Sequence, residues 1–427
     1  MMDAIVPQDG PRHEQVAIRH HQPARQDAQR AFQHAHVLVQ RKGLDALGRQ
    51  QVGGAGDEKR VSGAQKLFHG TGKLRGCCAC VHGMAMACGE RGSLMGMNEN
   101  VSKPLDRLSA ELAGDMDRVN ALIRERMASR HAPRIPEVTA HLVEAGGKRL
   151  RPMLVLAAAR LCGYAGESHI LLAAAVEFIH TATLLHDDVV DESQQRRGRP
   201  TANLLWDNKS SVLVGDYLFA RSFQLMADTE SMQVMRILAN ASATIAEGEV
   251  LQLTAAQDVS TTEDTYIQIV RGKTAALFSA ATEAGAVVAG ADPAVQRALF
   301  DYGDALGIAF QIVDDLLDYG GSTSSIGKNV GDDFRERKLT LPVIKAIARA
   351  DEVERAFWER TIGQGQQDEA DLATALEILR RREALEAARA DAIAWAQRAK
   401  AALQAAPDQP LRRILADLAD FVVSRLS

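Results

Sequence analysis

Two short acidic sequences of the same form lie within long apolar segments, and they constrain the fold of this chain more than any other feature. The first contains Asp187, Asp188 and Asp191, and the second contains Asp314, Asp315 and Asp318. On a helix, side chains four positions apart lie one above the other, so each cluster places its first and last carboxylates on one face. Like charges at this spacing destabilise an isolated helix by roughly 0.2–0.5 kcal/mol per pair. A bound cation would compensate each cluster. An exposed acidic helix end explains one such cluster equally well, but a second copy favours the cation.

The chain from residue 101 onward has the pattern of successive helices. Ala, Leu, Glu, Arg and Gln are abundant there, Gly and Pro fall mostly at junctions, and we find no run of strands. No linker rich in Pro, Gly or Ser divides this region, so we predict one large all-α domain over residues 97–427. The expected helices span about 103–128, 133–145, 151–161, 167–192, 200–206, 210–228, 231–254, 263–289, 293–318, 338–349, 352–403 with a break near 363–365, and 409–425.

Residues 1–96 have a different composition. They carry 13 Lys and Arg against 8 Asp and Glu, a net charge of +5, whereas the whole chain carries −5, so the remaining 331 residues carry −10. Helical or strand periodicity does not persist in this segment. We therefore expect it to be disordered, or to be an extension from a misassigned start with Met95 or Met97 as the true first residue. Four cysteines lie here, but their spacing does not fit zinc ligands: Cys77, Cys78, Cys80 and Cys88.

Basic residues occur at separate points along the predicted helical domain. Each group alone is weak evidence, because Gly146 and Gly147 can simply end one helix and Pro152 can start the next. Combined with the acidic clusters, they describe a pocket with a divalent ion on one side and cations on the other, suited to two polyanionic substrates. The basic residues are Lys148, Arg149, Arg151, Arg196, Arg197, Lys273, Lys328 and Lys338.

The identity of the expected metal follows from its ligands. Two facing clusters would supply up to six carboxylates, and Mg²⁺ takes carboxylate oxygens, keeps several waters and normally binds together with substrate phosphates. A di-iron bundle is the alternative, because Glu177 and His180 form a Glu-x-x-His element, but it needs a second such element and the sequence has none. For His180, a hydrogen-bonded core histidine is the alternative to a binding residue.

These motifs together resemble the trans-isoprenyl diphosphate synthases, and most closely the long-chain polyprenyl diphosphate synthases of octaprenyl or decaprenyl type. The resemblance covers about residue 97 to the end and does not reach residues 1–94. It implies the isoprenoid synthase type of fold, a helical bundle around a central substrate cavity. The matching segments are Gly-Gly-Lys-Arg-x-Arg-Pro at 146–152, His180 before the first acidic cluster, Asp-Glu-Ser-x-x-Arg-Arg-Gly at 191–198, Leu-Val-Gly-Asp-Tyr-Leu at 213–218, Gly-Lys-Thr-Ala at 272–275 and Gly-Lys-Asn-Val-Gly-Asp at 327–332.

The resemblance also implies a reaction. The protein would condense isopentenyl diphosphate repeatedly onto an allylic diphosphate such as farnesyl diphosphate, by Mg²⁺-assisted ionisation, condensation and proton elimination. The product would be a long all-trans polyprenyl diphosphate for the ubiquinone side chain. Breaking the allylic carbon–oxygen bond leaves a cation and a pyrophosphate, so the main catalytic task is to neutralise charge on the leaving group while water is excluded.

Residue roles come from the same resemblance. Asp187, Asp191 and Asp314 would bind Mg²⁺, with Asp188, Asp315 and Asp318 as further ligands or as groups that orient them. The allylic diphosphate would contact Arg196, Lys273 and Lys328. The diphosphate of isopentenyl diphosphate would contact Lys148, Arg151, His180 and Arg197. Thr274 and Gln311 would lie near the developing cation. Asp187, Asp191, Lys273 and Asp314 would be the catalytic residues.

Product length is expected to depend on two small residues that precede the first acidic cluster. In the family that this chain resembles, bulky aromatic residues at these places stop elongation early. Ala182 and Thr183 therefore indicate a long product, although octaprenyl, nonaprenyl and decaprenyl products are not separated by this reasoning.

Other functional classes and the cellular setting are also constrained. A terpene cyclase would not need a second diphosphate site, and a non-catalytic partner subunit usually loses its acidic motifs. The net charge of −10 disfavours nucleic-acid binding. The longest apolar stretch, residues 171–185, contains Glu177 and His180, so we expect no transmembrane segment. The single Cys162 of the helical region fits a reducing cytoplasm. From the resemblance we expect a homodimer, with peripheral membrane association for product release.

Overall fold

The computed structural model of the chain describes residues 103–144, 146–320 and 330–426. The predictions for residues 1–96 and for Lys328 concern parts of the chain outside these ranges. Within the described ranges the protein is built from helices, which confirms the predicted all-α class. The predicted domain limits stay a prediction.

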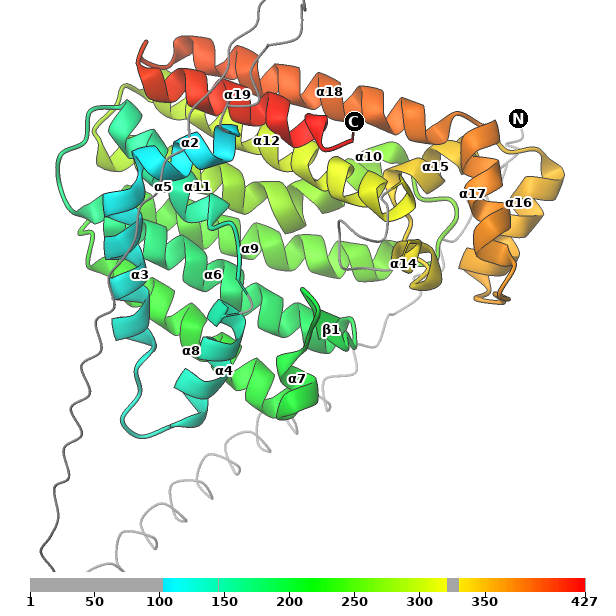
Figure 1. Ribbon diagram of the computed structural model, residues 1–427, viewed down its shortest axis with the longest axis horizontal. Helices are drawn as coiled ribbons and strands as arrows, with labels where there is room; N and C mark the ends of the chain where they lie inside the picture. Colours follow the sequence, from blue (N-terminus) through cyan, green and yellow to red (C-terminus); the bar gives the residue numbers. More distant parts are fainter. Residues whose placement is uncertain (1–102, 145, 321–329, 427) are drawn as a thin grey trace, which may run out of the picture. The chain divides into compact units, whose positions relative to one another are not determined.

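The helices follow one another closely along the chain (Figure 1). In order they are α2 (Pro104–Glu111), α3 (Ala113–Met127), α4 (Arg134–Glu144), α5 (Leu150–Leu161), α6 (Ser168–Val190), α7 (Ala202–Leu205), α8 (Asn208–Ala227), α9 (Met232–Ala255), α10 (Glu263–Val270), η1 (Arg271–Ala275), α11 (Ala276–Val288), α12 (Pro293–Gly320), α14 (Asp332–Arg335), α15 (Leu341–Ala348), α16 (Glu352–Trp358), η2 (Glu359–Gly363), α17 (Asp371–Arg381), α18 (Ala384–Ala402), η3 (Leu403–Ala405) and α19 (Pro410–Ser424).

Several expected helices are divided in the structure. The first expected helix breaks at Leu112 between α2 and α3, and the one expected over 263–289 is interrupted by the π-helical turn η1. The predicted break near residues 363–365 is confirmed, because η2 ends at Gly363 and Gly365 has a positive φ of 69°. A second break that we did not predict follows Arg381, where Glu383 takes the left-handed conformation.

The strands of the described residues form one short hairpin, which the sequence did not predict. Gln195–Arg196 (β1) pairs antiparallel with Arg199–Pro200 (β2). Arg197 and Gly198, the two residues between these strands, both have positive φ. That conformation is the one that two-residue hairpin turns require. The hairpin is too short to show strand periodicity, so its sequence carried only the turn signal.

The core of the bundle lies around α5, α6, α11 and α12. α5 packs against α6 and α11, and α11 packs against α12, with α8 and α18 flanking on either side (Figure 1). Nearly every side chain of α5 is buried, as expected of a helix that is apolar on all faces. Gly285 of α11 lies so close to the backbone of Val155 that an added Cβ would be 2.5 Å from its carbonyl oxygen. These close contacts fix the position of α6 and α12, which carry the acidic clusters.

The composition of helix α6 resembles that of a membrane-spanning helix. This helix is the one helix of the described residues that is long and apolar enough to cross a bilayer. However, 72% of its most apolar window is buried inside the bundle. Burial among other helices accounts for its hydropathy.

Candidate active site

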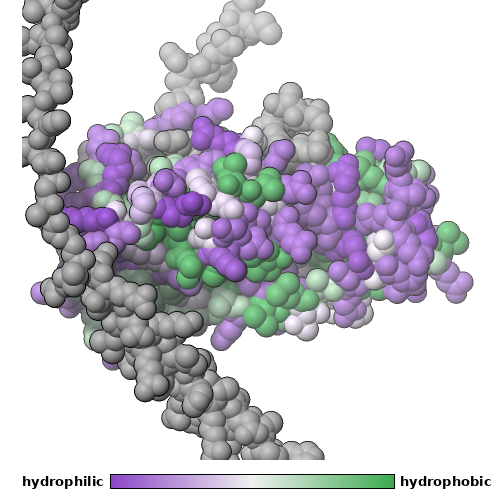
Figure 2. Space-filling model, turned by 90° about the horizontal axis from the view of Figure 1, so that it is seen from below, coloured by the Kyte–Doolittle hydropathy of each residue, from purple (hydrophilic) through white to green (hydrophobic). Residues whose placement is uncertain are grey.

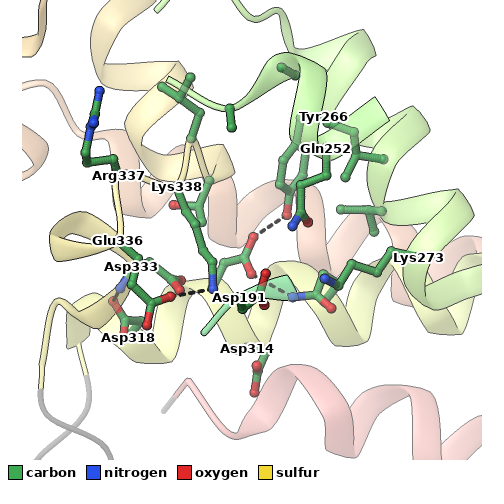
Figure 3. Close-up of a pocket in the computed structure, with 18 of the residues that line it drawn as sticks. Asp191, Gln252, Tyr266, Lys273, Asp314, Asp318, Asp333, Glu336, Arg337 and Lys338 are labelled. Carbon is green, nitrogen blue, oxygen red and sulfur yellow. Dashed lines mark hydrogen bonds and ion pairs between the residues drawn. The ribbon is translucent and has the colours of Figure 1, made fainter. Parts of the chain in front are cut away.

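Both acidic clusters reach one cavity of about 540 Å³ (Figure 3). The first cluster contributes Asp191 from the end of α6, and the second contributes Asp314 and Asp318 from the last turns of α12. The walls also include α9, α10, η1 and the segment 330–340. The side chains that bring charge or hydrogen-bonding groups are Asp191, Gln252, Tyr266, Lys273, Thr274, Gln311, Asp314, Asp315, Asp318, Asp333, Glu336, Arg337, Lys338 and Thr340.

The first cluster is positioned by the end of α6. Asp191 is the C-cap residue of the helix, and its N–H donates to the carbonyl of Asp187 at 2.8 Å. Asp188 is fully buried and accepts from Nε of Arg196 at 2.9 Å, while Nη2 of Arg196 lies 2.8 Å from the same oxygen. Asp188 therefore holds the side chain of the hairpin residue Arg196. This contact favours the expectation that Asp188 orients a neighbouring residue over the expectation that it binds the metal directly.

Asp187 has a markedly altered acidity. Burial raises the pKa of its carboxyl to about 7, against the opposing effect of Lys273 and with a further increase from the nearby carboxylates of Glu249 and Asp191. An ionised Asp187 is thus unfavourable in the protein without a bound cation. A divalent ion would remove that penalty.

The second cluster contains a buried hydrogen-bond network. Asp315 accepts from the hydroxyl of Tyr266 at 2.6 Å and from the amide of Gln311 at 2.8 Å. The carbonyl oxygen of that amide accepts from the hydroxyl of Thr274 at 2.7 Å. Burial raises the pKa of Asp315 to about 7, although both hydrogen bonds lower it. Asp315 therefore fixes Gln311 and Thr274 on the wall of the cavity, while Asp314 is exposed.

Lys273 enters the cavity because its helix is locally widened. It lies in η1, where Gly272 approaches Gly248 of α9 so closely that a Cβ on Gly272 would be 2.8 Å from the Cα of Gly248. The π-helical turn at this crossing turns Lys273 toward the first cluster. Its Nζ lies 2.9 Å from Oε2 of Glu249, and the other oxygen of Glu249 is buried without a hydrogen-bond partner. Glu249 was not predicted from the sequence.

Lys338 brings a second cation to the opposite wall. Its amine points toward Asp191 and Asp333 in Figure 3, and it lies 2.5 Å from Oε2 of Glu336. Burial by itself would lower the pKa of Lys338, but Glu336, Asp333 and Asp191 outweigh burial and raise it. Lys338 stays a cation close to both acidic clusters.

A small second pocket collects most of the remaining predicted cations. Its lining includes His180, Arg196 and Arg197, together with Arg149 and Glu177. Arg149 and Glu177 form an ion pair with both side chains mostly buried. Arg151 lies beside this pocket, with Nη1 3.2 Å from Nε2 of His180 and its guanidinium over the Phe278 ring at 4.7 Å. Burial, together with the surrounding arginines, holds the pKa of His180 well below its ordinary value, so it is neutral.

Of the predicted residues that the structure describes, six line neither pocket: Lys148, Arg151, Ala182, Thr183, Asp187 and Asp188. Lys148 is exposed next to the second pocket and is close enough to Asp314 to interact with it electrostatically. Ala182 is fully buried on α6, and Thr183 donates its hydroxyl to the carbonyl of His180 at 2.8 Å. Both expected length-determining residues thus lie in α6, the helix that carries the first cluster, and neither lines the cavity.

The carboxylates do not form a closed metal site by themselves. Among the described residues, no three His, Cys, Asp or Glu side chains are close enough together to hold an ion. Asp191 of the first cluster and Asp314, Asp315 and Asp318 of the second instead line the same cavity, together with Lys273 and Lys338. Oxygen donors on two walls suit Mg²⁺ that also binds water and substrate phosphate, because this ion is rarely enclosed by protein ligands alone. The arrangement fits a metal shared with a polyanion.

Comparisons with known proteins agree with this geometry. The family model described as Polyprenyl synthetase matches residues 132–379. Octaprenyl diphosphate synthase of Escherichia coli (strain K12) is 44% identical over 321 residues, covering 75% of this chain and 99% of that protein. The all-trans-nonaprenyl-diphosphate synthase (geranyl-diphosphate specific) of Rhodobacter capsulatus is 42% identical, covering 74% of this chain and 97% of that protein.

Solved structures give the same result. The crystal structure of a decaprenyl diphosphate synthase from Rhodobacter capsulatus is 72% identical, with a TM-score of 0.74, and covers 76% of this chain and 100% of that chain. The crystal structure of a polyprenyl synthase from Caulobacter crescentus CB15, complexed with calcium and isoprenyl diphosphate, is 54% identical, with a TM-score of 0.73. The match covers 76% of this chain and 98% of that chain. On this match in sequence and fold, the chain belongs to the polyprenyl synthetase family of prenyltransferases.

Proposed function

We propose that this protein condenses isopentenyl diphosphate repeatedly onto an allylic diphosphate such as farnesyl diphosphate. The product is a long all-trans polyprenyl diphosphate that supplies the side chain of ubiquinone. The observation that carries this proposal is the shared cavity, in which Asp191 of one cluster and Asp314 of the other lie together with Lys273 and Lys338. The octaprenyl, nonaprenyl and decaprenyl diphosphate synthases among the relatives support the long product.

The allylic diphosphate occupies the larger cavity in this proposal. Asp187, Asp191 and Asp314 hold Mg²⁺ with Asp318, while Asp188 and Asp315 orient their neighbours. Bound Mg²⁺ neutralises charge on the diphosphate. The calcium and isoprenyl diphosphate of the Caulobacter crescentus structure support a divalent ion together with a diphosphate at this kind of site. Lys273 and Lys338 contact the diphosphate oxygens from this cavity, Arg196 contacts them from the second pocket, and Lys328 remains an expected contact.

Isopentenyl diphosphate occupies the second pocket. Lys148, Arg151, His180 and Arg197 contact its diphosphate, and Arg149 joins them because it lines the same pocket. Glu177 pairs with Arg149 and limits the repulsion among the arginines. A neutral His180 donates or accepts one hydrogen bond there without adding charge.

The reaction then follows from where the charges lie. The allylic carbon–oxygen bond breaks, and the cations around the leaving group stabilise the negative charge that develops on it. Thr274 and Gln311 face the allyl cation with oxygen atoms. The double bond of isopentenyl diphosphate forms the new carbon–carbon bond, and a proton is lost to the departing pyrophosphate. The apolar lining on α10, including Ile269 and the buried Val270, limits access of water to the cation.

The assay that tests this function compares reactions with and without isopentenyl diphosphate. We expect farnesyl diphosphate to be consumed only when isopentenyl diphosphate is present, with products of increasing chain length on chromatography. Cyclisation or hydrolysis of the allylic diphosphate alone would indicate a terpene cyclase instead. Turnover that required a second type of subunit would indicate a heteromeric enzyme.

The exposed apolar side chains of the protein, together with the family resemblance, support a proposal that it forms a homodimer. Apolar side chains are exposed on two neighbouring helices, at Val212, Leu213 and Phe223 of α8 and at Met232, Val250 and Leu253 of α9. Figure 2 shows apolar patches on the face of the molecule seen from below. Such patches mark interaction surfaces. We propose that this α8–α9 surface is covered in a homodimer of a cytoplasmic enzyme, which associates with membranes peripherally to release its product.

A further inference from the structure

The segment 331–338 supplies one wall of the larger cavity, yet its own structure is irregular. It contains only the four-residue helix α14 before the chain turns at Arg337, which has a positive φ of 61°. Asp333, Glu336, Arg337 and Lys338 of this segment all line the cavity. Lys338 contacts Glu336 and Asp333 within the segment, so the position of the whole segment decides where Lys338 lies.

Two side chains connect this segment to the region that follows α16. Nε of Arg337 donates to the carbonyl of Ile362 at 2.8 Å, and Nη2 donates to the carbonyl of Gly363 at 2.7 Å. In the opposite direction, Nε2 of Gln367 donates to the carbonyl of Phe334 at 2.9 Å and to that of Thr361 at 3.1 Å. We call this reciprocal pair, Arg337 and Gln367, the clasp.

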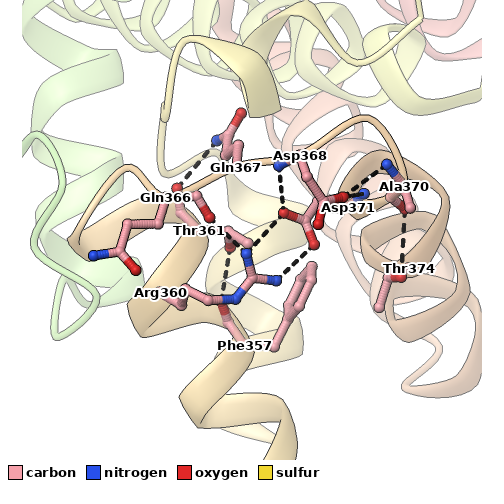
Figure 4. Close-up of polar contacts among 9 residues, drawn as sticks. All are labelled: Phe357, Arg360, Thr361, Gln366, Gln367, Asp368, Ala370, Asp371 and Thr374. Carbon is pink, nitrogen blue, oxygen red and sulfur yellow. Dashed lines mark hydrogen bonds and ion pairs between the residues drawn. The ribbon is translucent and has the colours of Figure 1, made fainter.

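The loop that carries Gln367 is itself firmly held (Figure 4). Arg360 forms a two-point ion pair with Asp371, at 2.6 Å and 2.9 Å, and also donates to the carbonyl of Gln366 at 2.6 Å. Gly365 has a positive φ, and an added Cβ would lie 2.6 Å from Nη1 of Arg337. The loop thus leaves room for the guanidinium of Arg337 and fixes the carbonyls that it contacts.

Apolar packing fixes the other end of the segment. Phe334 is buried, stacked on Phe357 at 6.4 Å between ring centroids and edge-on to Trp358 at 6.3 Å. An added Cβ on Gly331 would lie 2.3 Å from Leu372 of α17. The segment is docked on α16, η2 and α17 at both of its ends.

The clasp acts on Lys338 through one peptide bond. The side chains of Arg337 and Lys338 point in opposite directions in Figure 3: the guanidinium points away from the carboxylates and the amine points toward them. The N–H of Lys338 also donates to the carbonyl of Asp333 at 2.8 Å, and the N–H of Asp333 donates to Asp318 at 3.1 Å. Anchoring Arg337 therefore fixes the direction of Lys338 relative to the second acidic cluster.

We infer that Arg337 and Gln367 are positioning residues that aim Lys338 at the allylic diphosphate: Arg337 borders the cavity, but its guanidinium is bound to the carbonyls of Ile362 and Gly363 and points away from the carboxylates. This inference deepens the proposed function and rests on it for the identity of the ligand. Loss of either clasp residue would allow the amine of Lys338 to shift from its position beside the carboxylates. A displacement of about 1 Å in a group that contacts a substrate can lower the rate roughly 100-fold.

The test is steady-state kinetics of Arg337→Ala and Gln367→Ala with farnesyl diphosphate and isopentenyl diphosphate. We expect KM for farnesyl diphosphate to rise roughly 10- to 100-fold, while KM for isopentenyl diphosphate changes by less than about twofold. The controls are Arg335→Ala, in an exposed pair with Asp332 on the same segment, and Gln366→Ala, an exposed neighbour in the same loop. Both controls should keep the wild-type KM for farnesyl diphosphate.

A double-mutant cycle separates positioning from general destabilisation. In a Lys338→Ala background, Arg337→Ala should raise KM for farnesyl diphosphate by less than about twofold, because the residue through which it acts is gone. The full effect in that background, or wild-type kinetics in both single variants, would overturn the inference. If the wild-type protein converts neither substrate, the proposed function fails. The clasp is then judged by calorimetry with inorganic pyrophosphate and Mg²⁺, where unchanged binding in both variants overturns it.

Discussion

At the scale of a single residue, Asp187 interacts electrostatically with residues of both pockets, although it lines neither of them. Its carboxyl interacts with Lys273 of the larger cavity and with Arg196 of the smaller pocket, and burial raises its pKa to about 7. The side chain is therefore poorly suited to its surroundings unless a cation is bound. Such unfavourable placement of a charge is typical of functional sites.

Replacing Asp187 tests this interpretation. We expect Asp187→Asn to lower turnover by at least about 100-fold, because a ligand to the metal on the leaving group is lost. The folded state should be retained, since the neutral amide avoids burying a charge. Turnover by product chromatography and Tm by calorimetry measure the two effects. Asp117→Asn, which changes an exposed carboxylate on α3, should leave both unchanged. Near-normal turnover in Asp187→Asn would contradict the assignment.

The pKa of Asp187 also predicts a pH dependence. Its pKa in the folded protein lies above its ordinary value of 3.8. The stability associated with the protonated carboxyl is fully present below about pH 4 and is lost as the pH rises through about 7. Bound metal requires the ionised form. Mg²⁺ should therefore raise Tm more at pH 8 than at pH 6. Equal increases at the two pH values would show that Asp187 does not titrate with metal binding.

The residues before the first cluster carry the prediction about product length. Ala182 is fully buried and Thr183 is partly buried. We expect Ala182→Tyr and Thr183→Phe to shorten the polyprenyl product, because a bulky ring at either place blocks space for the growing chain. Thr183→Ser keeps the small hydroxyl side chain and serves as the control. Products of unchanged length on chromatography, from variants with normal Tm, would place the end of the product site elsewhere.

At the scale of the elements, the crossing of η1 and α9 decides where Lys273 points. Substituting Gly272 with Ala would force apart two backbones that are in contact. We expect a loss of stability of about 1–3 kcal/mol, as for other overpacked sites, together with weaker binding of the allylic diphosphate. Gly114→Ala in α3 is the control, because nothing lies within 4 Å of the added Cβ. It should stabilise the helix by roughly 0.5–1 kcal/mol. Wild-type stability in Gly272→Ala would contradict this account of the π-helical turn.

The elements also show what the sequence could and could not predict. Helix positions followed from composition and from glycine and proline at the junctions, so most boundaries differ from the prediction by only a few residues. The π-helical turn at η1 was not predicted, because it depends on contact between Gly248 and Gly272, which are distant in the sequence. The hairpin at 195–200 was missed because its two-residue strands are too short to show alternation.

The residues of the site also divide into those that the local sequence indicates and those that only the fold brings together. The acidic clusters were predicted from the spacing of their aspartates, whereas the roles of Gln311 and Lys273 were expected from the family resemblance; the structure places Asp191, Asp314, Gln311 and Lys273 on one cavity. Glu249 and Tyr266 were missed, since each acts through a partner far along the chain: Glu249 through Lys273 and Tyr266 through Asp315. Arg337 was missed because only the fold brings it to the carbonyls of Ile362 and Gly363. No sequence pattern records such contacts.

At the scale of the whole molecule, the α8–α9 surface predicts assembly. Leu213 is 67% exposed in a single chain. Leu213→Glu should shift the protein from dimer to monomer in analytical ultracentrifugation, because a charge would be buried at the interface. Val353→Glu changes an apolar side chain that is 80% exposed on α16 and should leave the assembly intact. A wild-type protein that sediments as a monomer would refute the proposed dimer.

The central claim is that both acidic clusters bind the same metal–diphosphate complex. Calorimetric titration of inorganic pyrophosphate in the presence of Mg²⁺ tests it most directly, using Asp191→Asn, Asp314→Asn and the double variant. We predict that each single change weakens Mg²⁺-dependent binding by about tenfold or more. The double variant should lose less than the product of the two single effects, because both residues act on one complex. Full binding in either single variant, or strictly independent effects, would contradict the account.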